Sequence, residues 1–310
     1  MPTPIPAFAD ALQSLQARYI DAQQGFALHP KGGYRADATA WAILALTAWE
    51  GDSARTNAAR QRLAQDQKPD GRVPLSTQHP EAFWPTALSI LAWQHDPNRE
   101  SSLKRARQFL LETSGTHRRR LAGEPVGHDP ALRGWPWIDR THSWVEPTAL
   151  ALMALKTEGY REHERVREAV AMLLDRQLPK GGWNCGNTIV FGRELHPYLH
   201  SSGMALTALA GLASLSEVGK TLTYLKAALP EVRTPLSLGW GVLGLTAWGE
   251  RPPDSLAWIQ ESLSRQKRYG PYNTCWLSLL LVAAAPLGQE AIFSRPGRVK
   301  QAGVQGMLTN

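Results

Sequence analysis

Two kinds of helical pattern alternate along the chain. In the first kind, Ala and Leu dominate and no side of the helix is polar. Six segments show this pattern: residues 36–49, 82–93, 144–155, 201–212, 236–248 and 272–285. A helix without a polar face has to be covered nearly all round, so we expect these six helices to lie in the interior.

The second kind of segment is amphipathic and lies between the apolar helices. The six amphipathic segments are residues 7–19, 53–65, 101–112, 163–176, 219–229 and 254–265. In the fourth of them, Val166, Val170, Leu173 and Leu174 follow the spacing i, i+4, i+7, i+8, which places them on one face of a helix. Such helices bury one stripe and expose the other, so we expect them on the outside.

The strict alternation of six outer and six inner helices predicts the architecture. Recurrence of one helix pair along a chain is typical of repeat proteins. We expect an all-α fold, an (α/α)6 toroid with six inner helices surrounded by six outer helices. Residues 5–285 form this single domain, with the inner helices beginning at one mouth. The segment 286–310 lacks a strong period, and we expect a tail that is loose or wrapped on the surface.

A turn motif follows several outer helices. It has a glutamine, a glycine four residues later and usually an aromatic residue two further on. Its copies are Gln177/Gly181/Trp183, Gln266/Gly270/Tyr272 and Gln67/Gly71, the last ending in Val73. Glycine permits the chain to reverse after a helix, and the amide of glutamine can bond the backbone groups left free there. We interpret the motif as a stabilising device without a catalytic role.

The distribution of charge bears on which class of partner the protein has. The net charge is +7, but the basic residues are scattered except at His117–Arg120, so we expect no nucleic-acid partner. A scaffold that contacts RNA or protein would need a continuous basic stripe with aromatic residues.

The cysteine content and the absence of targeting patterns bear on the compartment. Two cysteines make a disulfide framework unexpected, although one bridge stays open. The sequence has neither a signal-peptide pattern at its start nor an apolar run of 18 residues. We expect a cytoplasmic protein and leave peripheral membrane contact open.

The Gln-x-x-x-Gly-x-Trp turns and the Thr-Ala pair that opens several apolar helices carry a resemblance. They resemble the prenyltransferase and squalene-oxidase repeat, which builds the α/α toroids of squalene and oxidosqualene cyclases and of protein prenyltransferase β subunits. The resemblance extends over almost the whole chain. It implies a terpenoid cyclase-like protein whose partner is a hydrophobic small molecule, an isoprenoid or lipid.

Squalene–hopene-type cyclases carry Asp-x-Asp-Asp-Thr-Ala, in which the middle aspartate protonates an alkene. The matching stretch here is Trp-Val-Glu-Pro-Thr-Ala at residues 144–149. The resemblance implies that Glu146 is the acid or base and that Asp139 or His142 assists it. Trp144 and Pro147 replace the flanking aspartates. In the alternative interpretation, Glu146 is a carboxylate that caps a helix N-terminus, as we also expect for Asp37.

Protein prenyltransferases bind zinc through an aspartate, a cysteine two residues later and a later histidine. In the similar stretch at residues 272–280, Asn273 replaces the aspartate, and no histidine follows His200. His196 and His200 are four residues apart, but Pro197 between them favours a loop. We therefore expect no metal site and no cofactor, and we interpret Cys275 as a small buried residue.

Two long insertions, residues 113–143 and 177–200, precede the third and fourth apolar helices. Loops of this length in a compact domain usually cover or line a site, so we expect the two to lie side by side at one mouth. Aromatic residues in these loops and near the starts of inner helices are the expected ligand contacts: Trp41, Trp84, Trp135, Trp137, Trp144, Trp183, Phe191, Tyr272 and Trp276. The alternative is that individual tryptophans fill space between the rings.

Two functions remain open from the sequence. The first is a metal-independent isomerase or lyase resembling terpenoid cyclases, which holds an apolar isoprenoid in a central cavity and uses Glu146. The second is a toroid that binds a lipid, isoprenoid or peptide without converting it.

Overall fold

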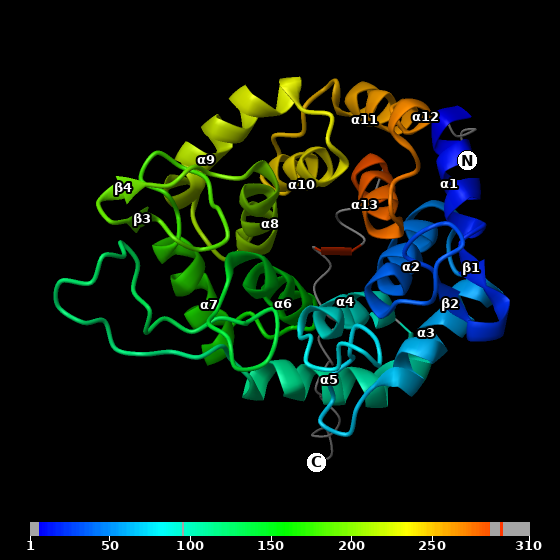
Figure 1. The fold of residues 1–310 in the computed structure, drawn as a ribbon, viewed down its shortest axis with the longest axis horizontal. Helices are drawn as coiled ribbons and strands as arrows, with labels where there is room; N and C mark the ends of the chain where they lie inside the picture. The colour runs from blue at the N-terminus through cyan, green and yellow to red at the C-terminus, as the bar shows by residue number, and fades with distance from the viewer. Residues whose placement is uncertain (1–5, 95, 286–291, 294–310) are drawn as a thin grey trace, which may run out of the picture.

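Six apolar helices form a closed inner ring in the computed structural model, which describes residues 6–94, 96–285 and 292–293 (Figure 1). They are α2 (Ala36–Glu50), α4 (Trp84–Trp93), α6 (Val145–Thr157), α8 (Leu199–Leu209), α10 (Pro235–Thr246) and α13 (Thr274–Ala284). Each contacts the next in this order, and α13 contacts α2. Every residue of α6 is buried, as expected for a helix without a polar face.

Six amphipathic helices surround the inner ring (Figure 1). They are α1 (Pro6–Gln16), α3 (Ala54–Asp66), α5 (Glu100–Glu112), α7 (Glu164–Asp175), α9 (Leu215–Ala228) and α11 (Ser255–Ser264). The predicted (α/α)6 toroid is therefore confirmed. Helix α9 begins four residues before the predicted start, because Ser214 and Glu217 form a reciprocal capping box there.

Short elements complete the connections between the helices. The helical ones are η1 (Asp21–Gln23), η2 (Pro97–Arg99), η3 (Leu229–Glu231) and α12 (Gln266–Tyr269). Two antiparallel hairpins pair β1 (Tyr19–Ile20) with β2 (Gly25–Phe26), and β3 (Ile189–Val190) with β4 (Arg193–Glu194).

A hydroxyl near the start of four inner helices explains the repeated Thr-Ala pattern. Each hydroxyl accepts a hydrogen bond of 2.8–3.0 Å from a backbone N–H in the preceding turn. The pairs are Thr39 with Phe26, Thr86 with Val73, Thr148 with Trp135 and Ser202 with Trp183. A buried N–H without a partner is costly, so these hydroxyls allow each turn to pack against its inner helix.

The turn motif stabilises the chain reversal, as predicted. Gly71, Gly181 and Gly270 have φ angles of 95°, 96° and 89°, a conformation that glycine adopts without strain. The amide of Gln67 donates to the Gly71 carbonyl at 2.9 Å, which satisfies a backbone group inside the turn.

The two ends of the helical repeat are joined directly. The N–H of Thr274, at the start of the last inner helix, donates to the Leu28 carbonyl at 2.8 Å. At the opposite end of the helices, the indole N–H of Trp49 donates to the Leu281 carbonyl at 2.8 Å. These bonds connect α13 to the N-terminal part of the chain and close the ring.

Two residues of the C-terminal tail lie inside the ring. Ile292 and Phe293 are 4% and 0% exposed, and the centroid of the Phe293 ring lies 6.0 Å from that of the Trp240 ring. The Gln94 amide donates to the Ile292 carbonyl at 3.1 Å. The expectation of a loose or surface-bound tail is wrong for these two residues, because the apolar centre of the ring removes their side chains from water. The rest of the tail lies outside the described residues.

Candidate functional site

The inner helices begin at the same end of the ring, which we call the mouth. Two contacts between neighbouring helices show this arrangement for α6 with α8 and for α13 with α2. Glu146 and Ser201, both within the first turns of α6 and α8, are hydrogen-bonded, and the Cys275 thiol at the start of α13 lies 3.6 Å from Asp37 in α2. Parallel helix N-termini concentrate positive potential at this end, which favours the placement of acidic side chains there.

Glu146 and Asp37 are the most buried acidic residues at the mouth, and each is 5% exposed. Oε1 of Glu146 accepts a hydrogen bond from the Ser201 hydroxyl at 2.5 Å, whereas Oε2 has no partner among the described residues. Burial raises the pKa of the Glu146 carboxyl, and the interactions with Ser201 and Cys185 only oppose this effect. The neutral acid therefore persists to a higher pH than usual, with Oε2 free to carry the proton.

The second long loop covers the start of α6. The Cys185 carbonyl accepts the backbone N–H of Val145 at 3.0 Å, which places the cysteine beside Glu146. Burial and the neighbouring carboxyl raise the pKa of the Cys185 thiol, so it remains a neutral thiol. Cys185 and Ser201 are the neighbours of Glu146 that sequence reasoning missed. For Ser201, its position at the start of a predicted inner helix was the available signal.

Asp37 has a different environment from Glu146. Its carboxylate accepts hydrogen bonds from the Arg35 guanidinium, at 2.9 Å from Nε, and from the backbone N–H of Ala38 at 2.8 Å. Asp37 is thus paired with a cation, and Glu146 is not. The two acids occupy equivalent places in their repeats, but only Glu146 combines burial with an oxygen that lacks a partner.

Aromatic and aliphatic side chains are exposed around the mouth. Trp276 in the first turn of α13 is 40% exposed, and Ile138 and Tyr198, which precede α6 and α8, are 47% and 46% exposed. The rings of Trp84 and Trp137 meet edge to face with centroids 5.3 Å apart. Large apolar groups left in water at one end of a domain are typical of a binding surface.

Trp41 lies deeper in the inner ring than Trp144, which is at the start of an inner helix. Trp41 is 7% exposed and packs edge to face on Trp240, with ring centroids 5.7 Å apart, below the mouth. Trp144 is partly buried at the N-terminal cap of α6, and its indole lies 4.3 Å from the imidazole of His142. Trp84, Trp137, Trp144 and Trp276 are the predicted aromatic residues that the structure leaves partly or largely accessible near the mouth.

Three other predicted ligand contacts belong to the turns. Trp135 and Trp183 are 1% and 0% exposed, and their indole N–H groups donate to the carbonyls of Leu110 and Leu173 on outer helices. The hydroxyl of Tyr272 likewise donates to the Ser262 carbonyl at 2.8 Å. These side chains fill the space between the inner and outer rings and are not part of the candidate site.

Asp139 and His142 are exposed and form no hydrogen bond with Glu146 in the described structure. The Asp139 carboxylate instead accepts the backbone N–H of Arg140 at 2.9 Å. The expected assistance to Glu146 is thus not formed by these two side chains, because the Asp139 N–H is bonded to the Glu81 carbonyl at 3.1 Å before α4 and the His142 ring packs on Trp144. Phe191, at the turn of the β3–β4 hairpin, is 81% exposed.

The two long loops lie side by side, as predicted. The Gly127 N–H donates to the Ile189 carbonyl at 2.8 Å, and the Phe191 N–H donates to the Pro125 carbonyl at 2.9 Å. These bonds make the two insertions one continuous covering beside the starts of α6 and α8.

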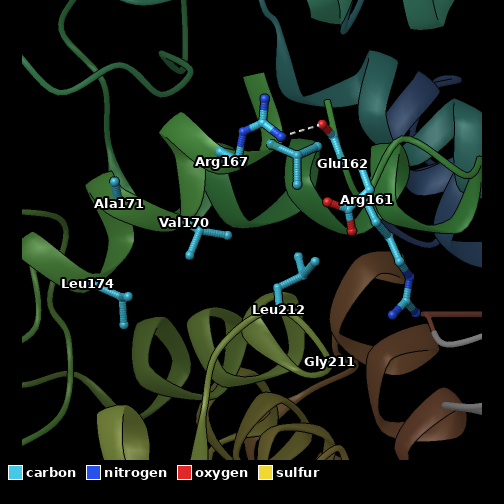
Figure 2. Close-up of a pocket in the computed structure, with 9 residues that line it drawn as sticks. Arg161, Glu162, Arg167, Val170, Ala171, Leu174, Gly211 and Leu212 are labelled. Atoms are coloured by element: carbon cyan, nitrogen blue, oxygen red, sulfur yellow. Dashed lines mark hydrogen bonds between the residues drawn. The ribbon is translucent and has the colours of Figure 1, made fainter. Parts of the chain in front are cut away.

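A groove of about 380 Å³ lies on the outer surface, between α7 and the turn that follows α8 (Figure 2). Val170, Leu174 and Leu212 give it an apolar floor, and Figure 2 shows Arg167 bonded to the Glu162 carbonyl at 2.8 Å. Arg161 and Leu212 follow the C-terminal ends of α6 and α8, so the groove lies away from Glu146, which is in the first turn of α6.

The described residues contain no group of three or more His, Cys, Asp and Glu side chains placed to hold a metal ion. None of their helices combines the length and apolar character needed to cross a membrane.

Solved structures with the same fold include proteins of different activities. The type II terpene cyclase MstE from Scytonema has a TM-score of 0.59 at 12% identity, covering 93% of this chain and 99% of that one. A variant of the α-1,6-mannanase GH76A from Salegentibacter sp. HEL1_6, in complex with α-1,6-mannotriose, has a TM-score of 0.58 at 11% identity, covering 93% and 99%.

A third structure is ent-copalyl diphosphate synthase from Streptomyces platensis, with a TM-score of 0.51 at 16% identity, covering 83% of this chain and 50% of that one. No family model matches the chain. No curated protein matches it either. At these identities the likeness establishes the α/α toroid fold, which hosts both terpene cyclases and glycoside hydrolases, and leaves the activity to be argued from the site.

Proposed function

We propose that the protein binds an apolar isoprenoid chain at the mouth of its ring and that Glu146 donates a proton to it. The observation that carries this proposal is the state of Glu146. It is a buried acid with a raised pKa, and Oε2 has no partner among the described residues. Burial keeps the proton on this acid until the substrate is in place. Because a raised pKa also makes Glu146 a weaker acid, transfer of the proton to an alkene depends on stabilisation of the resulting cation by the surrounding aromatic faces.

The side chains around the mouth suit an apolar guest. Trp276, Tyr198 and Ile138 are exposed there, and covering them with a hydrocarbon chain would remove apolar surface from water. Protonation of an alkene transfers the proton from Oε2 to carbon and leaves a carbocation. The faces of nearby indole rings, such as those of Trp84 and Trp144, stabilise such a cation, and the Ser201 hydroxyl stabilises the resulting carboxylate.

The arrangement of acids favours this chemistry over glycoside hydrolysis. In the mannanase complex, the variant that binds mannotriose has two aspartates replaced and is described as inactive. Glycosidases usually need two carboxyl groups that flank one bond. The present chain has no two acidic residues adjacent in sequence that would match the aspartate pair replaced in that variant.

Binding without conversion is the second candidate, and it too has a specific observation in its favour. Glu146 is only 5% exposed, with the Cys185 loop beside it, so an apolar chain could lie on the exposed aromatic residues without reaching Oε2. Both candidate functions involve the same ligand. They differ in whether the ligand reaches the carboxyl group of Glu146.

Lipid extraction separates these outcomes. The purified protein is exposed to a cellular lipid extract, and the retained lipids are identified by mass spectrometry. The proposal expects retention of isoprenoids by the wild-type protein and by Glu146→Gln, with conversion only in the wild type. Retention without conversion in both favours the second candidate, and no retained isoprenoid in either contradicts both.

A further inference from the structure

A second hollow, of about 400 Å³, lies between the two long loops. Its walls include three histidines and two arginines: His117, His128, His142, Arg118 and Arg176. None of the residues that line it is a hydrogen-bond partner of Glu146. We refer to this space as the loop hollow. Such a concentration of nitrogen donors around one space is unusual for a loop that serves only as a cover.

Two of these nitrogen atoms are buried without a partner. His128 and Arg176 are 7% and 5% exposed. Nδ1 of His128 and Nδ1 of His117 form no hydrogen bond with the described residues. A buried polar atom without a partner costs free energy, and a ligand that accepts hydrogen bonds would remove that cost.

The side chains that hold the arginines in place do not line the hollow. Arg118 is ion-paired with Glu124, and Arg176 lies 3.4 Å from Asp175 while donating to the Gly186 carbonyl at 2.8 Å. None of the described residues that line the hollow is acidic. The carboxylates therefore fix the arginines from outside, and the space itself is lined by guanidinium groups and by imidazoles that can each turn one N–H toward a ligand.

The electrostatic field at the hollow is positive. Burial lowers the pKa of His128 to about 4, and the charges that add to this effect are all cationic, with Arg176 and Arg120 the largest. Burial also lowers the pKa of His117 and His142, so the three imidazoles are neutral near pH 7. A field that disfavours protonation of these rings favours an anion at the same place.

We infer that the loop hollow binds the phosphate group of a small organic phosphate, at a site that does not include Glu146. Phosphate fits because it is a tetrahedral anion that accepts hydrogen bonds on several sides, whereas a carboxylate accepts them in one plane. The donors come from both long loops and from the end of α7, so they face the space from different directions. The volume leaves room for a modest organic group beside the phosphate.

Calorimetric titration of the full chain with inorganic phosphate at low ionic strength tests this site. The matched variants are Arg118→Gln, which removes a lining cation, and Arg119→Gln, which removes an exposed cation next to it. We expect saturable binding to the wild type, a roughly tenfold loss in Arg118→Gln and little change in Arg119→Gln. His128→Phe, which removes a buried donor, should weaken binding further while near-ultraviolet circular dichroism verifies the fold.

Absence of saturable binding to the wild type overturns the inference. Equal losses in Arg118→Gln and Arg119→Gln also overturn it, because they would reflect only general attraction to a basic surface. Acetate serves as the carboxylate comparison, and binding of acetate as tight as that of phosphate would refute the assignment to phosphate. Isoprenoid retention at the mouth is measured separately, so either proposal can fail alone.

Discussion

The hydroxyl of Ser201 donates to Oε1 of Glu146 at 2.5 Å and thereby links two helices of the inner ring. Both residues lie where α6 and α8 are otherwise packed through Ala, Leu and Met side chains. A polar link within an apolar ring contributes less to stability than apolar packing of the same volume would. Its presence is therefore better explained by the chemistry of a positioned acid than by the fold.

The pH dependence of stability tests the state of Glu146. Its pKa is raised in the folded protein, so the folded state binds more protons than the unfolded state from about pH 4.5 up to the raised pKa. Wild-type stability therefore falls as pH rises through that window. Glu146→Gln lacks this loss, and its melting temperature should exceed that of the wild type at neutral pH but not at pH 4.

Glu217→Gln is the control, because it should respond in the opposite direction. Glu217 caps α9, and hydrogen bonds from Ser214 lower its pKa, so its contribution is present above pH 4.5 and is lost as pH falls. If Glu146 were a helix cap of the same kind, Glu146→Gln would also lower the melting temperature at neutral pH. That result would refute the acid interpretation.

Close approach of α8 and α10 predicts a severe effect of Gly203→Ala. A Cβ atom on Gly203 would lie 2.2 Å from the Trp240 carbonyl oxygen, and that atom belongs to the backbone. The helices would have to separate, at a cost of about 1–3 kcal/mol. Gly219→Ala, on the outer helix α9, meets nothing within 4 Å and should stabilise by about 0.5–1 kcal/mol. Urea unfolding measures both, and equal effects would contradict the ring packing.

Lys156 should be needed for stability although it is a charged residue inside the protein. Its ammonium donates to the carbonyls of Thr207, Ala208 and Ala210 at 3.0–3.2 Å, which satisfies the C-terminal end of α8. Lys156→Met leaves those acceptors unpaired and should cost about 1–3 kcal/mol. Lys226→Met removes an exposed lysine and should change the free energy of unfolding by less than about 0.5 kcal/mol. Similar losses in both variants would argue against this role.

Trp276→Ala should weaken ligand binding without unfolding the protein. Its side chain is 40% exposed at the mouth, so truncation costs little packing but removes apolar contact with a bound chain. We expect about a tenfold loss of affinity for a radiolabelled isoprenoid alcohol in equilibrium binding. Tyr269→Ala, which truncates a 69% exposed aromatic residue on α12 rather than on an inner helix, should bind as the wild type does. Unchanged affinity in Trp276→Ala would show that the ligand does not contact Trp276 at the mouth and would contradict this binding site.

The ring could be predicted from the sequence because each helix carries its own signal. Helices such as α6 lack any polar face, and helices such as α7 have one apolar stripe, so the inner and outer rings follow from the pattern. The pairing of the two long loops could also be predicted, since they precede neighbouring inner helices.

The arrangement inside the site could not be predicted in the same way. Whether a tryptophan faces the mouth or an outer helix depends on the turn that carries it. Trp135 and Trp137 are two residues apart, yet only Trp135 is buried against an outer-helix carbonyl. The position of Phe293 inside the ring depends on the path of the tail, for which local periodicity carries no signal.

Product analysis with an unsaturated isoprenoid tests the central claim most directly. Squalene is incubated with the wild-type protein and with Glu146→Gln, and the extracts are separated by gas chromatography and identified by mass spectrometry. We predict that both proteins bind squalene and that only the wild type yields a cyclised isomer of the same mass. Squalene that binds the wild type and is recovered unchanged, or an isomer formed equally by Glu146→Gln, would contradict the role of Glu146 as the proton donor.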